Sequence, residues 1–332
     1  MKVMMLYQPG LVEEKRLKSS TLDLSNPRAN EVLIRVKVCG VCRTDLHIVE
    51  GDLLTTVLPI IPGHQVVGFI EETGNGMDDL KVGDRVGLPW MSSTCCNCDF
   101  CRGGLENLCD MARFTGLNRH GGYAEYVTAP RQFVYPLPEG IPDEQAAPLL
   151  CAGVIGYRTL KLSGIQSGQK LGIYGFGASA HITIQIARHW NCDVYVFTRS
   201  KEHRRHAEEL GAVWVGGSKE DPGTELDVGL IFAPAGWLMV DGLKKVCKGG
   251  TVVSAGIHMS DIPQFPYRLL YGERNMTTVS NATYKDGIEL LQLAKEIPIH
   301  TAVKLYKLEK ANEALRDMKD SRFNGAAVLT TD

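Results

Sequence analysis

Short runs of β-branched and other apolar residues recur through the first 135 residues, separated by Gly, Pro and Asp. Residues 32–36 (VLIRV) and 66–70 (VVGFI) are typical of these runs. Branched apolar side chains fit the pleated surface of a sheet, whereas Gly, Pro and Asp favour the turns between strands. The N-terminal part is therefore predicted to be mostly β.

From about residue 153 the pattern changes to apolar strands that alternate with amphipathic helical stretches. We expect strands at 171–174, 194–197, 228–232, 251–255 and 277–280. Strands and helices in alternation predict βαβ units around a parallel sheet. Beyond about residue 284 the pattern predicts helices at 287–296 and 310–318 and a closing strand at 326–329.

Length and composition narrow the class of protein. A chain of 332 residues is expected to form about two domains. A net charge of -2 without any long Lys/Arg run argues against a nucleic-acid backbone or an anionic membrane as partner. No apolar run reaches the roughly 18 to 20 residues of a membrane span, and Pro9-Gly10 interrupts any signal-peptide core. We expect a cytoplasmic protein with a small-molecule partner.

Four cysteines follow a C-x2-C-x2-C-x7-C spacing. Two-residue gaps let neighbouring thiolates converge on one ion, and the longer gap lets the chain close a tetrahedral all-sulfur site of the structural kind. An iron–sulfur cluster is the alternative, although ferredoxin runs continue to a Cys-Pro, whereas Asp110 follows the last cysteine here. We call residues 95–109 the cysteine lobe and expect structural zinc at Cys95, Cys98, Cys101 and Cys109.

A glycine-rich G-x-G-x-x-A stretch comes directly after the predicted strand that ends at residue 174 and opens a helical stretch, 182–190. Its first, third and sixth residues are Gly175, Gly177 and Ala180. Glycines allow the tight turn and the close approach of the backbone to a pyrophosphate, whose charge the helix N-terminus favours. In this context the stretch predicts a dinucleotide-binding turn rather than an ordinary βα turn.

A more dispersed set consists of Cys42, His64 and Cys151. Three protein ligands with one open position describe a catalytic zinc site. Spacing alone does not show that residues so far apart meet, so ordinary core packing stays open as a reading of each.

The chain resembles the zinc-containing alcohol dehydrogenases of the medium-chain dehydrogenase/reductase superfamily over essentially its whole length. The resemblance rests on motifs that occur in the family order: GVCRTDLH (40–47), GHQVVG (63–68), VGDRVG (82–87), the cysteine lobe, GGYAEY (121–126), CAGVIGY (151–157) and the glycine loop.

The resemblance implies a fold and an activity. The fold is a GroES-like β catalytic domain (1–152), a Rossmann NAD(P)-binding domain with a doubly wound parallel sheet (153–283) and a return segment (284–332) that completes the catalytic domain. The activity is reversible hydride transfer between an alcohol and NAD(P)+. It also implies catalytic zinc at Cys42, His64 and Cys151, hence two zinc ions per chain, and a homo-oligomer, either dimer or tetramer.

Motif matches imply further roles around that zinc. Thr44 and His47 are expected to relay the alcohol proton outward, and Asp45 is expected to accept the second ring N–H of His64. Arg43 matches a position near the cofactor pyrophosphate, with a solvated surface arginine as the alternative.

Two positions bear on charge and substrate. Gln65 stands where the family usually has Glu, which removes one negative charge beside the metal. Trp90 matches an aromatic residue that walls the substrate pocket and favours apolar primary alcohols over polyols, although a core tryptophan is the competing interpretation. A polyol dehydrogenase therefore remains an alternative.

The end of the second strand of the parallel sheet predicts the preferred cofactor. NAD-binding domains usually place an acidic residue there, about 20 residues after the glycine loop, for the adenosine ribose. This chain has Thr198, Arg199 and Ser200 instead. A guanidinium and two hydroxyls suit a 2′-phosphate, so we expect NADP(H) to be preferred over NAD(H).

Two other classes of protein fit the sequence less well. A zinc-free quinone or ene reductase of the same superfamily lacks the cysteine lobe and the ligand triplet that this chain keeps. A zinc ribbon for nucleic acid is disfavoured because only Arg102 and Arg113 flank the lobe.

Overall fold

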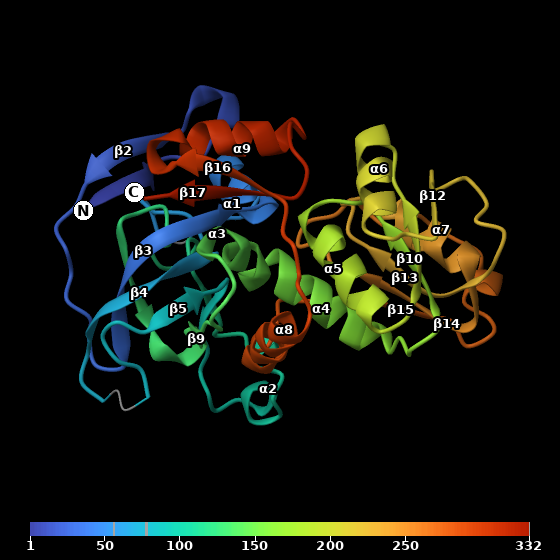
Figure 1. Cartoon of the computed structure of the whole chain (residues 1–332), viewed down its shortest axis with the longest axis horizontal. Coiled ribbons are helices and arrows are strands. Elements are labelled where there is room, and N and C mark those ends of the chain that lie inside the picture. Colours follow the sequence, from blue (N-terminus) through green and yellow to red (C-terminus); the bar gives the residue numbers. More distant parts are fainter. Residues whose placement is uncertain (56, 77–78, 332) are drawn as a thin grey trace. The chain divides into compact units, whose positions relative to one another are not determined.

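The computed structural model describes residues 1–55, 57–76 and 79–331, which divide into two compact units (Figure 1). The first, here called the β unit, consists of Met1–Cys151, Thr283–Glu296 and Thr301–Asp332. The second, here called the parallel-sheet unit, consists of Ala152–Ala282 and Ile297–His300.

The β unit is built on a seven-stranded sheet in the order β16-β17-β3-β4-β5-β9, with β8 also paired to β3. Two small antiparallel pairs, β1-β2 and β6-β7, accompany it. Its strands are β1 (Lys2–Leu6), β2 (Leu17–Thr21), β3 (Glu31–Val41), β4 (Val66–Thr73), β5 (Arg85–Leu88), β6 (Met91–Ser93), β7 (Arg113–Phe114), β8 (Tyr126–Pro130), β9 (Tyr135–Pro136), β16 (Val303–Lys307) and β17 (Ala326–Thr330). Its helices are α1 (Arg43–Glu50), α2 (Asp99–Arg102), α3 (Asp143–Ala146), α8 (Tyr284–Glu296) and α9 (Ala311–Lys319).

The C-terminal strand joins the N-terminal core. β17 pairs antiparallel with β3, which places Leu329 opposite Cys39, and both side chains are buried. Helix α9 buries Ala311, Ala314 and Leu315, an i, i+3, i+4 stripe. A fully buried leucine stabilises by about 1.5–3 kcal/mol, so the last segment contributes directly to the core of the first.

The parallel-sheet unit contains six strands in the order β12-β11-β10-β13-β14-β15, and every neighbouring pair is parallel. Counted within the unit this is the 3-2-1-4-5-6 order of a doubly wound dinucleotide-binding fold. The strands are β10 (Lys170–Tyr174), β11 (Asp193–Phe197), β12 (Trp214–Gly216), β13 (Leu226–Ile231), β14 (Val246–Ser254) and β15 (Asn275–Thr278). The helices are α4 (Ala152–Ser163), α5 (Ala178–His189), α6 (Lys201–Glu209) and α7 (Trp237–Lys245).

The predicted fold class is confirmed, and the individual elements differ mainly at their ends. All five predicted strands of the parallel sheet exist, but β14 begins at Val246, five residues early, because Val246 pairs with Leu226 across a register shift. The short strands β12 and β16 were not predicted because β12 is only three residues long, and β16 interrupts its apolar residues with lysines and leaves three of its five residues exposed.

The helices predicted at 182–190, 287–296 and 310–318 are α5, α8 and α9. Helix α5 begins at Ala178 because Gly177 caps it and its first turn holds small residues that the apolar pattern overlooks. Among the described residues, no helix combines the length and the apolar character needed to span a membrane.

Candidate active site

The pairing of two strands brings Cys42 and His64 together. β3 and β4 are antiparallel, with Cys39 opposite Val66, and the Gly40 N–H donates to the Gln65 carbonyl. The end of β3 therefore faces the start of β4. Residues 22 positions apart in sequence meet, with Cys42 Sγ 3.2 Å from His64 Nε2.

Cys151 reaches the same place from a different part of the chain. It follows the 3-10 helix Ala147–Leu150, whose last residue packs on β5 at Gly87. A Cβ on Gly87 would come within 2.7 Å of Leu150 Cδ2, so the Leu150 side chain lies directly on the β5 backbone. As a result Cys151 Sγ lies 3.9 Å from Cys42 Sγ, although 109 residues separate them in sequence.

The three ligand atoms fit one metal ion. The two sulfurs and the imidazole nitrogen all lie within 4.8 Å of one another. Burial alone raises the pKa of Cys42, but the hydrogen bond from Cys151 and the charge of His64 outweigh it and hold that pKa well below its ordinary value. Two sulfurs and one imidazole are a donor set that zinc prefers, and three protein ligands leave a coordination position for substrate.

Asp45 supports this set from behind. Its Oδ1 lies 3.0 Å from His64 Nδ1 and accepts the Gly63 N–H at 3.1 Å, while its Oδ2 accepts the Cys42 N–H at 2.9 Å. Cys42 and Asp45 thus form a capping box at the start of α1. The His64 ring is held with Nδ1 toward the carboxylate and Nε2 toward the cysteine.

The two residues expected in a proton relay lie on α1. Thr44 is buried, and its backbone N–H donates to Cys42 Sγ at 3.3 Å. His47 lies one turn further, with Nδ1 2.8 Å from Asp52 Oδ2. Its side chain is 13% exposed, and that of Asp52 is 44% exposed. Asp52 was not singled out from the sequence, and its position just beyond the end of α1 is the only signal that points to it. Arg43 is exposed at the first position of α1.

Trp90 lies against His64. Its ring centroid is 4.9 Å from that of His64, edge to face, and the ring also stacks on Phe114 at 4.9 Å. Gln65 is 1% exposed, and its side-chain Nε2 has no hydrogen-bond partner among the described residues.

The cysteine lobe forms a second donor set. Cys95, Cys98, Cys101 and Cys109 present four sulfurs within 4.8 Å of one another, and all ten cysteines of the chain are free of disulfides. Backbone N–H groups, first that of Asn97 and then that of Cys98, lower the pKa of Cys95 to about 6. Four converging thiols with preformed N–H donors fit a closed zinc site.

The glycine loop lies at the reversal of strand order in the parallel-sheet unit. Gly175 has φ +89°, and a Cβ there would come within 2.9 Å of Ala233, which follows β13. Gly177 caps α5, and Ala180 is fully buried beneath it. The N-terminus of α5 therefore opens at the switch point between β10 and β13, where doubly wound folds bind dinucleotides.

Comparison with known proteins decides the family. Residues 28–139 match the alcohol dehydrogenase GroES-like domain. A probable alcohol dehydrogenase of Mycobacterium tuberculosis is 41% identical over 97% of this chain and 95% of its own length. An alcohol dehydrogenase of Geobacillus stearothermophilus is 35% identical over 97% of this chain and 99% of its own. A cobalt- and zinc-bound thermostable alcohol dehydrogenase of Pyrobaculum aerophilum superposes with a TM-score of 0.90 at 25% identity, covering 99% of each chain.

The chain belongs to the zinc-containing alcohol dehydrogenases of the medium-chain dehydrogenase/reductase superfamily. It is accordingly an oxidoreductase acting on CH–OH groups. The resemblance stated from the motifs is confirmed.

In this dehydrogenase two arginines lie at or near the turn after β11, and only one of them is bonded to it. Arg199 is exposed, whereas Arg204 Nε donates to the Thr198 carbonyl at 3.0 Å and its Nη2 lies 3.1 Å from Glu220 Oε1. Ser200 caps α6 by accepting the His203 N–H at 3.3 Å. Arg204 anchors the turn, which leaves the Arg199 side chain at the surface.

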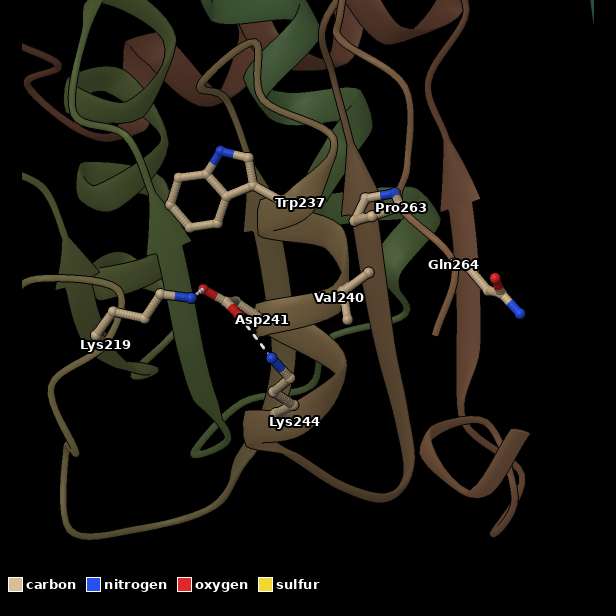
Figure 2. A pocket seen from close by; sticks show the side chains of 7 residues that line it. All are labelled: Lys219, Trp237, Val240, Asp241, Lys244, Pro263 and Gln264. Atoms are coloured by element: carbon tan, nitrogen blue, oxygen red, sulfur yellow. Dashed lines mark hydrogen bonds and ion pairs between the residues drawn. The ribbon is translucent and has the colours of Figure 1, made fainter. Parts of the chain in front are cut away.

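The dehydrogenase also has a hollow of about 360 Å3 in the parallel-sheet unit, which the sequence did not indicate. Lys219 Nζ lies 2.9 Å from Asp241 Oδ2, and Lys244 Nζ lies 3.0 Å from Asp241 Oδ1. Figure 2 shows both lysines directed at this carboxylate, with Trp237 above it. Both ammonium groups are held by the same buried carboxylate, and nothing else in the lining identifies a ligand, so we assign the hollow no role.

Proposed function

We propose that the chain is a zinc-dependent alcohol dehydrogenase that converts apolar primary alcohols reversibly to aldehydes and prefers NADP(H). The observation that carries the proposal is the convergence of Cys42, His64 and Cys151, with Asp45 behind His64. A quinone or ene reductase without zinc has no use for such a set, so that alternative is disfavoured.

Two zinc ions per chain follow from the two donor sets. Cys42, His64 and Cys151 would hold the catalytic ion, and the four cysteines of the lobe would hold the structural one. When bound, the catalytic ion supplies Lewis acidity toward the alcohol or carbonyl oxygen, and the nicotinamide exchanges the hydride. Asp45 keeps the His64 tautomer that leaves Nε2 available as a ligand.

The chain's own groups move the proton. The Thr44 hydroxyl is proposed to accept it from the alcohol and pass it outward toward His47, whose exposure lets it exchange with water. Asp52 would hold the His47 ring in place through the contact at Nδ1.

Cofactor recognition is assigned to the parallel-sheet unit. Backbone N–H groups at the start of α5 are proposed to bind the pyrophosphate, with Gly175 and Gly177 keeping the approach clear. Arg199, with the Thr198 and Ser200 hydroxyls, would bind the 2′-phosphate of NADP(H). The cap in which Ser200 Oγ accepts the His203 N–H leaves the hydroxyl proton available for donation. Arg43 is proposed to contact the pyrophosphate.

Substrate preference rests on Trp90. Its stack with Phe114 beside His64 makes an apolar aromatic surface next to the metal ligands, which suits an apolar chain better than a polyol. Gln65, neutral and buried, leaves the negative charge at the site to the two thiolates and Asp45.

The expected domain boundaries, oligomeric state and cellular location are also proposals. The division into domains at 1–152, 153–283 and 284–332 would be tested by limited proteolysis. A dimer or tetramer would be tested by analytical ultracentrifugation, and a cytoplasmic location by cell fractionation.

The proposal is tested by a rate screen with the metal content measured in parallel. Purified protein is assayed with primary alcohols of increasing chain length, secondary alcohols and polyols, using NADP+ and NAD+. We expect two zinc ions, the highest kcat/KM for an apolar primary alcohol, and NADP+ preferred. Full activity after removal of zinc by a chelator, or turnover of polyols alone, contradicts it.

A further inference from the structure

Tyr123 is a buried tyrosine beside the Gly63–His64 turn, and none of the roles described above involves it. It is completely buried, and its hydroxyl has no hydrogen-bond partner among the described residues. Its ring lies against Gly63: a Cβ there would come within 2.4 Å of Tyr123 Cδ1. Gly63 directly precedes the ligand His64, so the phenol packs on the turn that presents this ligand.

The hydroxyl lies in the field of Asp45. Burial, and then the charge of Asp45, raise the pKa of Tyr123 well above its ordinary value. An ionised carboxylate offers about four acceptor positions. In Asp45 three are used: Oδ1 accepts from Gly63 and faces His64 Nδ1, and Oδ2 accepts from Cys42. One acceptor position on Oδ2 remains, and the O–H of the buried Tyr123 is a donor without a partner among the described residues.

We propose that Tyr123 is a positioning residue for the catalytic metal site, with its ring holding the Gly63–His64 turn and its O–H serving as the fourth donor to Asp45. The inference rests on the proposed zinc at Cys42, His64 and Cys151. A carboxylate with all its acceptor positions filled keeps a fixed orientation, and through the His64 Nδ1–H it fixes the ligand ring. Removing the hydroxyl loosens Asp45 and therefore weakens the hold of His64 on the metal.

The test uses Tyr123→Phe, which keeps the ring against Gly63 and removes only the hydroxyl. The chain supplies a matched control in Tyr174, equally buried, with its hydroxyl also lacking a partner among the described residues but in the parallel-sheet unit. Zinc release to a chromophoric chelator is followed in full-length wild type, Tyr123→Phe and Tyr174→Phe. The cysteine lobe, which the substitution does not touch, gives the internal reference for the second ion.

We expect Tyr123→Phe to release one zinc about 10-fold faster than wild type, at the low end of effects seen for groups that orient metal ligands, with the other ion unchanged. Tyr174→Phe releases both at the wild-type rates. Cobalt substituted at the catalytic site would show shifted absorption bands in Tyr123→Phe alone, a change that a merely structural role of the hydroxyl does not produce.

A double-mutant cycle with Asp45→Asn shows whether the Tyr123 hydroxyl acts on zinc binding through Asp45. If the hydroxyl acts through Asp45, Tyr123→Phe has little further effect in the Asp45→Asn background. Equal zinc release from wild type and Tyr123→Phe, or the same acceleration in both backgrounds, overturns this inference alone. A wild-type protein that holds only the zinc of the cysteine lobe overturns the proposed function and this inference with it.

Discussion

Asp45 Oδ1 lies 3.0 Å from His64 Nδ1, and both side chains are completely buried. A buried carboxylate is costly unless it is paired and hydrogen-bonded, and here the imidazole and two backbone N–H groups satisfy it. The same contact fixes which nitrogen of His64 is free for a metal. One residue pair thus links local stability to the chemistry of the site.

Asp45→Asn keeps the size of the side chain and removes its charge. Because the amide is a weaker acceptor from His64, we expect zinc affinity at the catalytic site to fall by about 10- to 100-fold. Competition with a chelator of known affinity measures it, with Asp52→Asn as control because the contact that Asp52 makes is with His47, which is not one of the proposed zinc ligands. An unchanged affinity in Asp45→Asn would show that the carboxylate does not orient the ligand.

The two metal sites should respond differently to loss of one sulfur. Cys151→Ser is expected to remove one zinc and abolish activity while the thermal unfolding midpoint changes little. Cys98→Ser is expected to lower that midpoint, because a structural zinc contributes directly to folding free energy. Metal analysis and thermal unfolding of both variants check this. Full activity in Cys151→Ser would remove this residue from the catalytic site.

The relay predicts a moderate effect at His47. His47→Ala should slow alcohol oxidation by about 10- to 100-fold at neutral pH, since it removes a proton carrier and leaves the Lewis acid in place. Asp52→Asn should give a smaller loss because it removes only the partner of the His47 ring. Steady-state rates across pH are the measurement. An unchanged rate and pH profile in His47→Ala would mean that the proton leaves by another route.

Cofactor preference should depend on Arg199. One charge-assisted contact is worth roughly 1.5 to 3 kcal/mol, which corresponds to a preference for NADP(H) of about 10- to 150-fold. Arg199→Ala should remove most of this preference and leave kcat/KM for NAD(H) nearly unchanged. Arg205→Ala is the matched control, an exposed arginine that pairs with Glu209 on α6. A wild-type preference for NAD(H) would contradict the assignment.

His181 should make stability fall in mild acid. Burial, and then the charge of His206, lower its pKa to about 4. Between about pH 6.5 and pH 4 the histidine binds a proton in the unfolded chain, where its pKa is about 6.5, but stays neutral in the folded chain. The free energy of unfolding is therefore highest above about pH 6.5 and decreases as pH falls toward about 4. The contribution between pH 7 and pH 5 is about 2 kcal/mol.

Urea unfolding at both pH values measures this difference. His181→Leu should reduce the loss by about that amount, and exposed His189→Gln is the control for removing one histidine. If His181→Leu and wild type lose the same stability between pH 7 and pH 5, His181 is not the responsible group.

The sequence by itself determined the features that depend on neighbours along the chain. Alternation of apolar strands and helices predicted the parallel sheet, because each βαβ unit is a local pattern. The C-x2-C-x2-C spacing predicted the cysteine lobe, since two-residue gaps already force the sulfurs to converge. The glycine turn between β10 and α5 was readable for the same reason.

The tertiary structure decided what depends on distant residues. Cys42 is 22 residues from His64 and 109 residues from Cys151, and the register of β3 with β4 and the packing of Leu150 on Gly87 bring the three together. The contact of Tyr123 with the Gly63 turn has no counterpart in the sequence pattern, and for the contact of Asp52 with His47 the only signal is the position of Asp52 just beyond α1. Strand pairing and core packing between distant segments fix such positions, and no local spacing encodes them.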